Sequence, residues 1–257
     1  MIPRQASSVL IEPDWPAPDR VMALSTTRGN GVSLSPWSSL NLAAHVGDSQ
    51  RSVEENRRRL AATVPLGTAI QWLDQVHGNR VVAAASGAAP EADASWTQAP
   101  AQACAVLTAD CLPVLFCDDD ASVVAAAHAG WRGLQGGVLD ATVAALPANA
   151  EKLLAWLGPA IGPEAFEVGP DVRDAFLGVA KPAQLRAIDA CFTPASARPG
   201  YFFADLYELA RVRLASLGVT RVFGGGYCTF TDASRFFSYR RDGQTGRMAS
   251  LIYLKPM

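Results

Sequence analysis

The chain has 257 residues, of which 49% are hydrophobic and 18% are charged, and its formal net charge at pH 7 is -2. This composition is typical of a folded globular protein and excludes an intrinsically disordered chain. The small net charge favours no nucleic-acid partner, and no stretch approaches the roughly 20 apolar residues that a membrane-spanning helix needs.

The first residues and the cysteines point to a reducing compartment. A short apolar run near the start is interrupted by Glu12 and Asp14, so we expect no signal peptide and a cytoplasmic protein. The five cysteines are odd in number and form no Cys-x-x-Cys pair. We therefore expect free thiols or metal ligands rather than disulfides.

The first quarter of the chain predicts two strands, a long loop and a helix. Residues 8–12 and 21–26 read as strands. Residues 27–48 are rich in Gly, Ser, Pro and Asn, and long ordered loops of this kind tend to carry function. Residues 49–64 predict a surface helix, with Ser49 as its N-cap, acidic residues early and arginines late.

The centre of the chain is more apolar. Residues 69–86 indicate a strand, a turn at Gly78-Asn79 and a second strand. Two apolar runs follow at 103–120 and 121–130, separated by an aspartate turn. Both are too apolar to be half exposed, so we expect strands that are covered on both faces.

The last part alternates between helical and strand patterns, and it ends in a hairpin-like unit with its turn at 241–246. The expected helices are 132–146, 169–180 and 203–219, and the expected strands lie within 152–163, 221–230 and 235–256. No linker or repeat divides the chain. We therefore predict one domain over 1–257, of mixed α/β class, with largely buried β-sheets flanked by helices.

Two of the three histidines and one cysteine form a candidate metal site. His77 lies at the expected turn, Cys111 lies in an apolar run, and His128 ends a strand. Two imidazoles and a thiolate suit zinc, and three protein ligands leave one coordination position open for catalysis. The alternative is a buried cysteine and a hydrogen-bonded core histidine, and spacing alone does not decide between them.

Arginines lie near these residues in the sequence. Arg132 follows Gly130 at an expected helix start, where backbone N–H groups and a guanidinium together favour an anion. Arg240, Arg241 and Arg247 surround the turn near the C-terminus. These arginines either bind phosphate or are ordinary solvated surface residues.

Six stretches of the chain together resemble the YfiH family, also called the multicopper polyphenol oxidase or laccase-like family. They run in the family's order from about residue 25 to the end, and they read SLNLAAHVGD, QVHGNRV, TADCLPVLF, AAHAGWRGL, IGPEAFEVG and RFFSYRRDGQTGRMASLI. The resemblance implies an α/β fold shared with the catalytic domain of a bacterial deamidating toxin. It also implies that His77, Cys111 and His128 form the family's metal site.

The family has been given conflicting activities: copper laccase, or phosphorolysis of adenosine, inosine and methylthioadenosine together with adenosine deamination. A multicopper oxidase needs a blue-copper site and a histidine-rich trinuclear cluster, which three histidines cannot supply. We therefore expect a Zn²⁺ site, in which Cu²⁺ is also possible. Phosphate would be bound by Arg132 with Arg241 or Arg247, and the ribose by Asn41 and His45.

Other interpretations stay open from the sequence. Asp110 is a candidate general acid/base or a partner of a site histidine, but only if the strand ends or bulges there. A cysteine hydrolase or amidase, with Cys111 as nucleophile and His128 as base, would act on another substrate such as a cell-wall precursor. A zinc-stabilised interaction module would use Cys191 as a further ligand. The sequence does not determine the oligomeric state.

Overall fold

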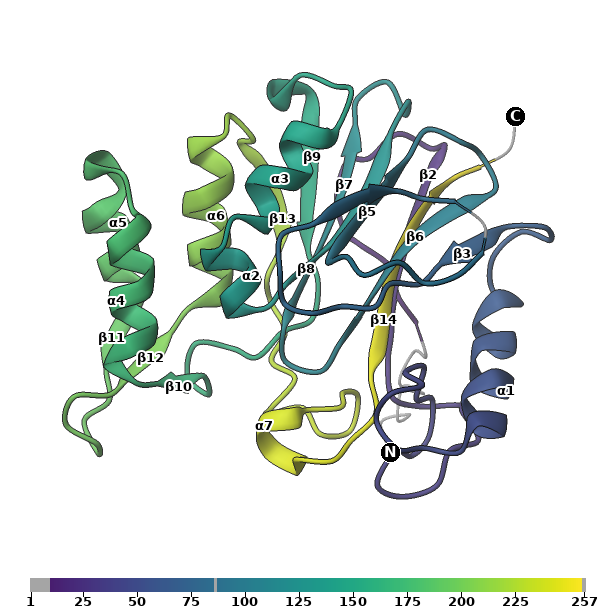
Figure 1. Ribbon diagram of the computed structural model, residues 1–257, viewed down its shortest axis with the longest axis horizontal. Helices are drawn as coiled ribbons and strands as arrows, with labels where there is room; N and C mark the ends of the chain where they lie inside the picture. Colours follow the sequence, from purple (N-terminus) through teal and green to yellow (C-terminus); the bar gives the residue numbers. More distant parts are fainter. Residues whose placement is uncertain (1–9, 86, 256–257) are drawn as a thin grey trace, which may run out of the picture.

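Two β-sheets are stacked face to face in the middle of the molecule, with helices on both outer sides (Figure 1). The computed structural model describes residues 10–85 and 87–255. Helix α1 (Gln50–Ala61) covers the outer face of one sheet, and a group of helices covers the outer face of the other. The predicted mixed α/β class is confirmed.

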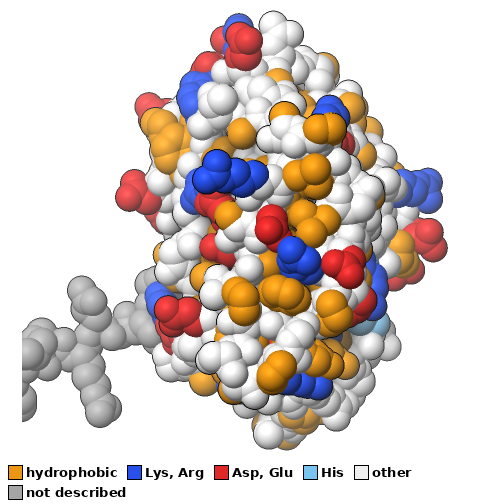
Figure 2. Space-filling view, turned by 90° about the vertical axis from the view of Figure 1, so that its left-hand side faces the viewer, with side chains coloured by type: hydrophobic (Ala, Val, Ile, Leu, Met, Phe, Trp, Pro, Cys, Tyr) orange, Lys and Arg blue, Asp and Glu red, His pale blue; other side chains and the backbone are white. Residues whose placement is uncertain are grey.

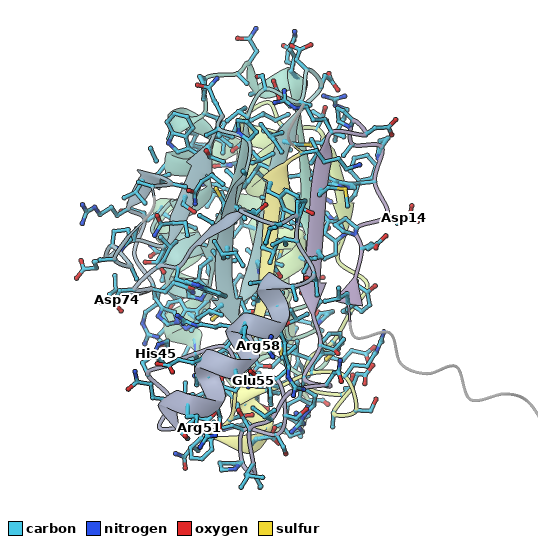
Figure 3. The ribbon with its side chains drawn as sticks, turned by 90° about the vertical axis from the view of Figure 1, so that its right-hand side faces the viewer. Asp14, His45, Arg51, Glu55, Arg58 and Asp74 are labelled. Carbon is cyan, nitrogen blue, oxygen red and sulfur yellow. The ribbon has the colours of Figure 1, made fainter. Side chains whose placement is uncertain are left out.

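The five-stranded sheet is mostly antiparallel and has the C-terminal strand at its centre. Its order is β1 (Leu10–Ile11), β2 (Val21–Thr26), β14 (Met248–Leu254), β6 (Gln102–Thr108) and β3 (Ala69–Gln71). The outer face of this sheet packs against α1 and against the loop that precedes it. Glu55 on the solvent side of α1 forms ion pairs with Arg58 and Arg59 (Figure 3).

The six-stranded sheet positions the functional residues. Its order is β13 (Arg221–Gly224), β9 (Leu153–Leu157), β7 (Leu112–Asp118), β8 (Val124–Ala129), β5 (Ala94–Thr97) and β4 (Val81–Ala83). Its outer face packs against α2 (Trp131–Gln135), α3 (Val138–Ala145) and α6 (Leu206–Ser216).

A smaller lobe lies beyond these helices (Figure 1). It contains the strands β10 (Glu167–Val168), β12 (Phe202–Ala204) and β11 (Phe192–Pro194), and the helices α4 (Pro170–Val179) and α5 (Leu185–Ala190). Short 3-10 turns lie at Ala150–Lys152 and Pro182–Gln184, and α7 spans Tyr239–Asp242. On the side of the molecule where α4 and α5 lie, acidic and basic side chains are interspersed (Figure 2).

Successive side chains of each strand face opposite sides of the sheet, and this alternation forms the hydrophobic layers on either side of it. In β6, Cys104 and Val106 pack between the two sheets, whereas Ala103 and Ala105 face the side of α1. Successive side chains of a strand point to opposite faces, so a strand that is apolar throughout is covered on both sides. The strands β6, β7 and β8 are buried at every position, as their composition predicts. Within the described residues, no helix is long and apolar enough to cross a membrane.

Within two predicted strand units the chain crosses between the sheets. The unit at 69–86 does contain a strand, a turn and a second strand, but β3 pairs with β6 in one sheet and β4 pairs with β5 in the other. The run at 103–120 contains two strands, β6 and β7, which also belong to different sheets. Apolar composition indicates that a strand is buried, but it does not indicate which sheet the strand joins. The crossings between the sheets therefore could not be predicted from the hydrophobic periodicity.

Other predicted elements differ in their bounds. The expected helix at 132–146 is two helices, because Gly137 has a φ of 88° and interrupts it. The strand expected at 221–230 ends at Gly224, where φ is 77°. The expected closing hairpin is instead the short helix α7 followed by β14, which lies between β2 and β6. Part of the expected strand at 8–12 lies outside the described residues.

Candidate metal centre and adjoining hollows

The three predicted ligands come from three segments that meet at one end of the stacked sheets. His77 lies where the chain crosses from β3 to β4, and Cys111 lies where it crosses from β6 to β7. His128 is near the end of β8 and lies on the same face of that strand as Val124 and Ala126, which pack between the sheets. The antiparallel register of β7 and β8 pairs Pro113 with His128 and therefore brings Cys111 to the same place.

The geometry of the three side chains fits a metal ion. One ligand atom from each of His77, Cys111 and His128 lies within 4.8 Å of the others. The Sγ of Cys111 and the Nε2 of His77 are 3.7 Å apart. Ligand atoms in a tetrahedral zinc site lie about 3.4–3.7 Å apart, given the usual Zn–S and Zn–N bond lengths. Among the described residues this is the group that could hold a metal, and Cys191 does not belong to it.

A buried carboxylate holds both histidines. Oδ1 of Asp93 lies 2.8 Å from Nδ1 of His128 and accepts a hydrogen bond from the backbone N–H of His77 at 2.9 Å. Oδ2 of Asp93 accepts from the N–H of Gly78 at 2.7 Å and of Val76 at 3.3 Å. His77 has a φ of 62°, so this turn holds a backbone conformation that residues other than glycine rarely adopt. Asp93 was not predicted from the sequence.

Glycines allow the segments to approach one another. A Cβ at Gly130 would lie 2.8 Å from Sγ of Cys111 and 3.0 Å from Cδ2 of His77. A Cβ at Gly133 would lie 2.9 Å from the carbonyl oxygen of Gly78. The two glycines that flank Trp131 and Arg132 therefore have a packing role, because the helix start touches the ligand cluster.

The side chains of the ligand cluster shift one another's pKa values. Burial by itself raises the pKa of the Cys111 thiol, but the adjacent imidazoles, His128 first, outweigh it and lower that pKa to about 6. Burial lowers the pKa of His128, but the Cys111 thiolate and the Asp93 carboxylate outweigh it and raise that pKa to about 9. Without a metal, the cluster therefore favours a thiolate beside an imidazolium. A metal ion would replace the imidazolium proton, because it takes neutral imidazole as its ligand.

Two hollows open on either side of the cluster. One has a volume of about 410 Å³ and is lined by all three ligands together with His45, Gln75 and Arg247. The other has a volume of about 250 Å³ and is lined by His77, Cys111, Trp131, Arg132, Phe166 and Arg240, among others. Tyr239, which is 61% exposed, borders both hollows. The ligand cluster is therefore accessible from two sides.

Three of the predicted substrate-binding residues line these hollows. Arg132 is exposed and stacks on Trp131, with its guanidinium carbon 4.4 Å from the ring centroid. Arg247 lines the larger hollow, and burial lowers its pKa. His45 lies at the same edge of the molecule as Asp74 (Figure 3), and burial and then the charge of Arg247 lower its pKa.

Asn41 is placed differently from its predicted role at a ribose. Its side chain is fully buried. Its amide donates to the carbonyl of Ala43 and to Asp48, and its oxygen accepts from the N–H groups of Ala43 and Arg247. Both donor hydrogens and both lone pairs are therefore used inside the protein. Asn41 fixes the backbone at Arg247 and does not face a ligand.

The side chain of Arg241 is also bonded within the fold. The guanidinium of Arg241 donates to the carbonyls of Thr229, Phe230 and Phe236 and pairs with Asp242, so Arg241 lines neither hollow beside the metal cluster.

Strand β6 ends at Thr108, two residues before Asp110, which has a φ of 90°. Its carboxylate accepts from Thr229, Ser238 and the N–H of Arg240. The carboxylate that bonds a site histidine belongs instead to Asp93. The one signal in the sequence for Asp93 is an aspartate between small apolar residues at the start of a strand, and it was missed because its partners are distant in the chain.

Comparison with known proteins decides the family. A family profile described as multi-copper polyphenol oxidoreductase laccase matches residues 22–255. The chain belongs to the YfiH family. YfiH of Escherichia coli, named a purine nucleoside phosphorylase, is 54% identical over 250 residues, which cover 96% of this chain and 99% of that protein. A Pseudomonas aeruginosa protein named purine nucleoside phosphorylase is 59% identical over 245 residues, covering 95% and 98%.

Solved structures agree with this assignment to the YfiH family. A Neisseria meningitidis protein of the family DUF152 superposes with a TM-score of 0.91 at 49% identity, covering 96% of this chain and 100% of that one. YlmD from Geobacillus stearothermophilus superposes with a TM-score of 0.87 at 30% identity, covering 98% of each chain.

Proposed function

We propose that this protein is a zinc-dependent purine nucleoside phosphorylase that cleaves adenosine, inosine and methylthioadenosine with phosphate and also deaminates adenosine. The observation that carries the proposal is the position of Arg247. Its guanidinium lies in the same 410 Å³ hollow as the His–Cys–His cluster, and none of the ion pairs within residues 10–85 and 87–255 includes it.

A partly buried cation without a carboxylate partner favours an anion from solution, since burying an isolated charge is costly. Nη1 of Arg247 donates to the carbonyls of Thr245 and Gly246, which fix the guanidinium in place. A guanidinium suits the oxygens of phosphate through paired hydrogen bonds. We assign phosphate to Arg247, with Arg132 on the other side of the cluster as a second cationic group.

The chemistry of phosphorolysis fits this arrangement. A phosphate oxygen forms a bond to C1′ of the ribose as the bond between C1′ and the purine nitrogen breaks, and the purine leaves with that electron pair and takes up a proton. Arg247 would hold the phosphate, His45 would contact the ribose, and Trp131 and Phe166 offer aromatic faces to the purine. A bound zinc ion, which His77, Cys111 and His128 would hold, would supply Lewis acidity for phosphorolysis and for deamination.

The decisive test is the release of free base by purified, zinc-loaded protein. Adenosine, inosine and methylthioadenosine are incubated with and without phosphate, and bases and nucleosides are separated by chromatography. We expect adenine or hypoxanthine only when phosphate is present, together with some inosine from adenosine. Base release that does not depend on phosphate, or no release at all, contradicts the proposal.

Arg247 provides a matched variant. Arg247→Gln should raise the KM for phosphate by about 10-fold or more, since a charge-assisted hydrogen bond is worth roughly 1.5–3 kcal/mol. Arg186→Gln is the control, because Arg186 is exposed on α5, outside both hollows. An unchanged KM for phosphate in Arg247→Gln would remove Arg247 from the phosphate site.

A second candidate function, a cysteine hydrolase or amidase, is favoured by one observation. Cys111, His128 and Asp93 lie in the order of a nucleophile, a base and the carboxylate that orients the base. The chelated protein distinguishes the two functions. A hydrolase of this kind keeps its activity on amide substrates when the metal is removed, whereas the proposed zinc enzyme loses its activity.

A copper-dependent polyphenol oxidase is the third candidate, and it is the function in the family's description. The chain has three histidines, and His45 is not part of the metal-binding group. One metal per chain without blue absorbance would exclude a multicopper enzyme, whereas several copper ions per chain would favour it.

A further inference from the structure

Asp93 is the most completely bonded carboxylate near the metal cluster. Its side chain is 0% exposed, and it lies directly before β5. It bonds to Nδ1 of His128 and to three consecutive backbone N–H groups, those of residues 76–78. Its own carbonyl oxygen also accepts from the N–H of His128 at 2.7 Å. One residue thus connects the turn that carries His77 with the strand that carries His128.

These contacts determine how His128 faces the cluster. An ionised carboxylate only accepts hydrogen bonds, so the ring nitrogen beside it, Nδ1, must carry the proton. The other nitrogen, Nε2, then remains as the ligand atom directed at the metal. The same carboxylate holds His77 in its left-handed backbone conformation, because both of its oxygens accept from the turn.

We propose that Asp93 is the positioning residue of the metal site, setting the tautomer of His128 and the backbone of His77 together. The inference deepens the proposed function and rests on its metal. Asp93 touches neither the substrate nor the metal, and it acts through the two histidines. In other metal sites, removing such a carboxylate weakens metal binding by about 10–100-fold.

A carboxamide cannot replace this carboxylate in either orientation. If the side-chain amide of an Asp93→Asn variant turned its NH₂ toward the 76–78 turn, that NH₂ would oppose the backbone N–H groups. If the NH₂ faced His128, it would favour a proton on Nε2 and remove the lone pair that binds the metal. One of the two histidines therefore loses its support whichever way the amide turns.

Asp118 is the matched control. It is another buried aspartate of the same sheet, at the opposite end, and it accepts from the N–H groups of Ser122 and Val123 and from the hydroxyl of Ser122. In Asp118→Asn the NH₂ can face the hydroxyl of Ser122, which is able to accept a hydrogen bond. This variant keeps the local turn and leaves the metal cluster untouched.

The experiment measures zinc affinity of full-length wild type, Asp93→Asn and Asp118→Asn by competition with a chromophoric chelator. We expect a dissociation constant about 10–100-fold higher in Asp93→Asn and unchanged in Asp118→Asn. Equal affinity in wild type and Asp93→Asn overturns the inference, and so does an equal loss in both variants. Thermal melting of the metal-free proteins verifies that both variants are folded.

A second measurement needs no variant and keeps the inference testable if Asp93→Asn does not fold. In zinc-loaded wild type with ¹⁵N-labelled histidine, His128 should carry its proton on Nδ1, in a hydrogen bond. Metal bound through Nδ1, or no zinc binding at all, overturns the inference. Zinc binding without phosphorolysis contradicts the proposed function alone, because neither readout depends on turnover.

Discussion

The two ends of strand β7 place a cysteine in opposite environments. Cys111 precedes the strand and has its pKa lowered to about 6, because the two imidazoles outweigh the effect of burial. Cys117 lies near the other end, where burial and then the charge of Asp118 raise its pKa to about 12. A thiol at one end of the strand is therefore reactive and a thiol at the other end is inert, according to what other segments bring to each.

The aspartates at the two ends differ in the same way. Asp118 bonds to Ser122 and Val123, only a few residues further along the chain. Asp93 bonds to His128, 35 residues away, and Asp110 bonds to Ser238, 128 residues away. A carboxylate that completes its own turn stabilises the fold locally. Carboxylates that join distant segments assemble a site, and this difference separates the functional end of the sheet from the structural one.

The largest difference between the two ends should be thiol reactivity. At pH 7 a thiol with a pKa of about 6 is mostly thiolate, whereas one with a pKa of about 12 is ionised in about 1 molecule in 10⁵. After chelation, iodoacetamide should therefore modify Cys111 and leave Cys117 intact, as read by peptide mass mapping. The rate at Cys111 should rise as the pH increases through about 6 and fall below it. A midpoint near the ordinary value of 9.0 would show that the imidazoles do not stabilise the thiolate.

Removing the thiol of Cys111 should have a much larger effect than removing the thiol of Cys117. Cys111→Ala should lose bound zinc and reduce kcat/KM for adenosine phosphorolysis by about 10³-fold, since a metal ion contributes several kcal/mol to transition-state stabilisation. Cys117→Ala should retain both zinc and activity and lower stability by about 1 kcal/mol. Metal analysis and phosphorolysis on the same preparations measure both effects. If Cys111→Ala retained zinc, the assignment of the ligands would be wrong.

The close approach of Gly130 to the ligand cluster can be disturbed by one methyl group. Gly130→Ala should place a Cβ against Sγ of Cys111 and Cδ2 of His77 and lower kcat/KM by about 10²-fold, because small displacements at a site are costly. Gly178→Ala in α4 is the control, since a Cβ there would have nothing within 4 Å. The control should keep its activity and gain about 0.5–1 kcal/mol of stability. Full activity in Gly130→Ala would mean that the ligand cluster can shift without cost.

The smallest effect on activity is expected from a variant of Asp118, at the end of the sheet away from the metal cluster. Asp118→Ala leaves the N–H groups of Ser122 and Val123 without their acceptor, so the free energy of unfolding should fall by about 1–3 kcal/mol. Zinc affinity and kcat/KM should remain at wild-type values, because the turn shares no contact with the ligand cluster. Denaturant unfolding and a metal titration measure the two quantities. A change in zinc affinity would show that the two ends of the sheet are energetically coupled, and it would contradict the distinction between them.

Sequence patterns predicted the individual elements better than their pairing. Helices α4 and α6 and the strands β2 and β9 lie where periodicity and composition placed them. In the expected strand–turn–strand unit at 69–86 the two strands join different sheets, and the expected hairpin at 235–256 is instead helix α7 followed by β14. Asn41 was chosen as a polar partner for the ribose, and Arg241 as a cationic donor to phosphate. Their hydrogen bonds are instead used within the fold, which only contacts between distant segments reveal.

Composition and apolar patterning, which are local properties, predicted the mixed α/β class. Residue chemistry offered His77, Cys111 and His128 as candidate ligands, and the resemblance to the YfiH family favoured them over the alternative. The residues that support these three side chains became visible only in the folded chain. Asp93 replaced Asp110 as the histidine's partner because strand register places it beside His128. Gly130 matters because two chain crossings between the sheets converge on it. Such contacts depend on which strands become neighbours, and no local pattern along the chain encodes that pairing.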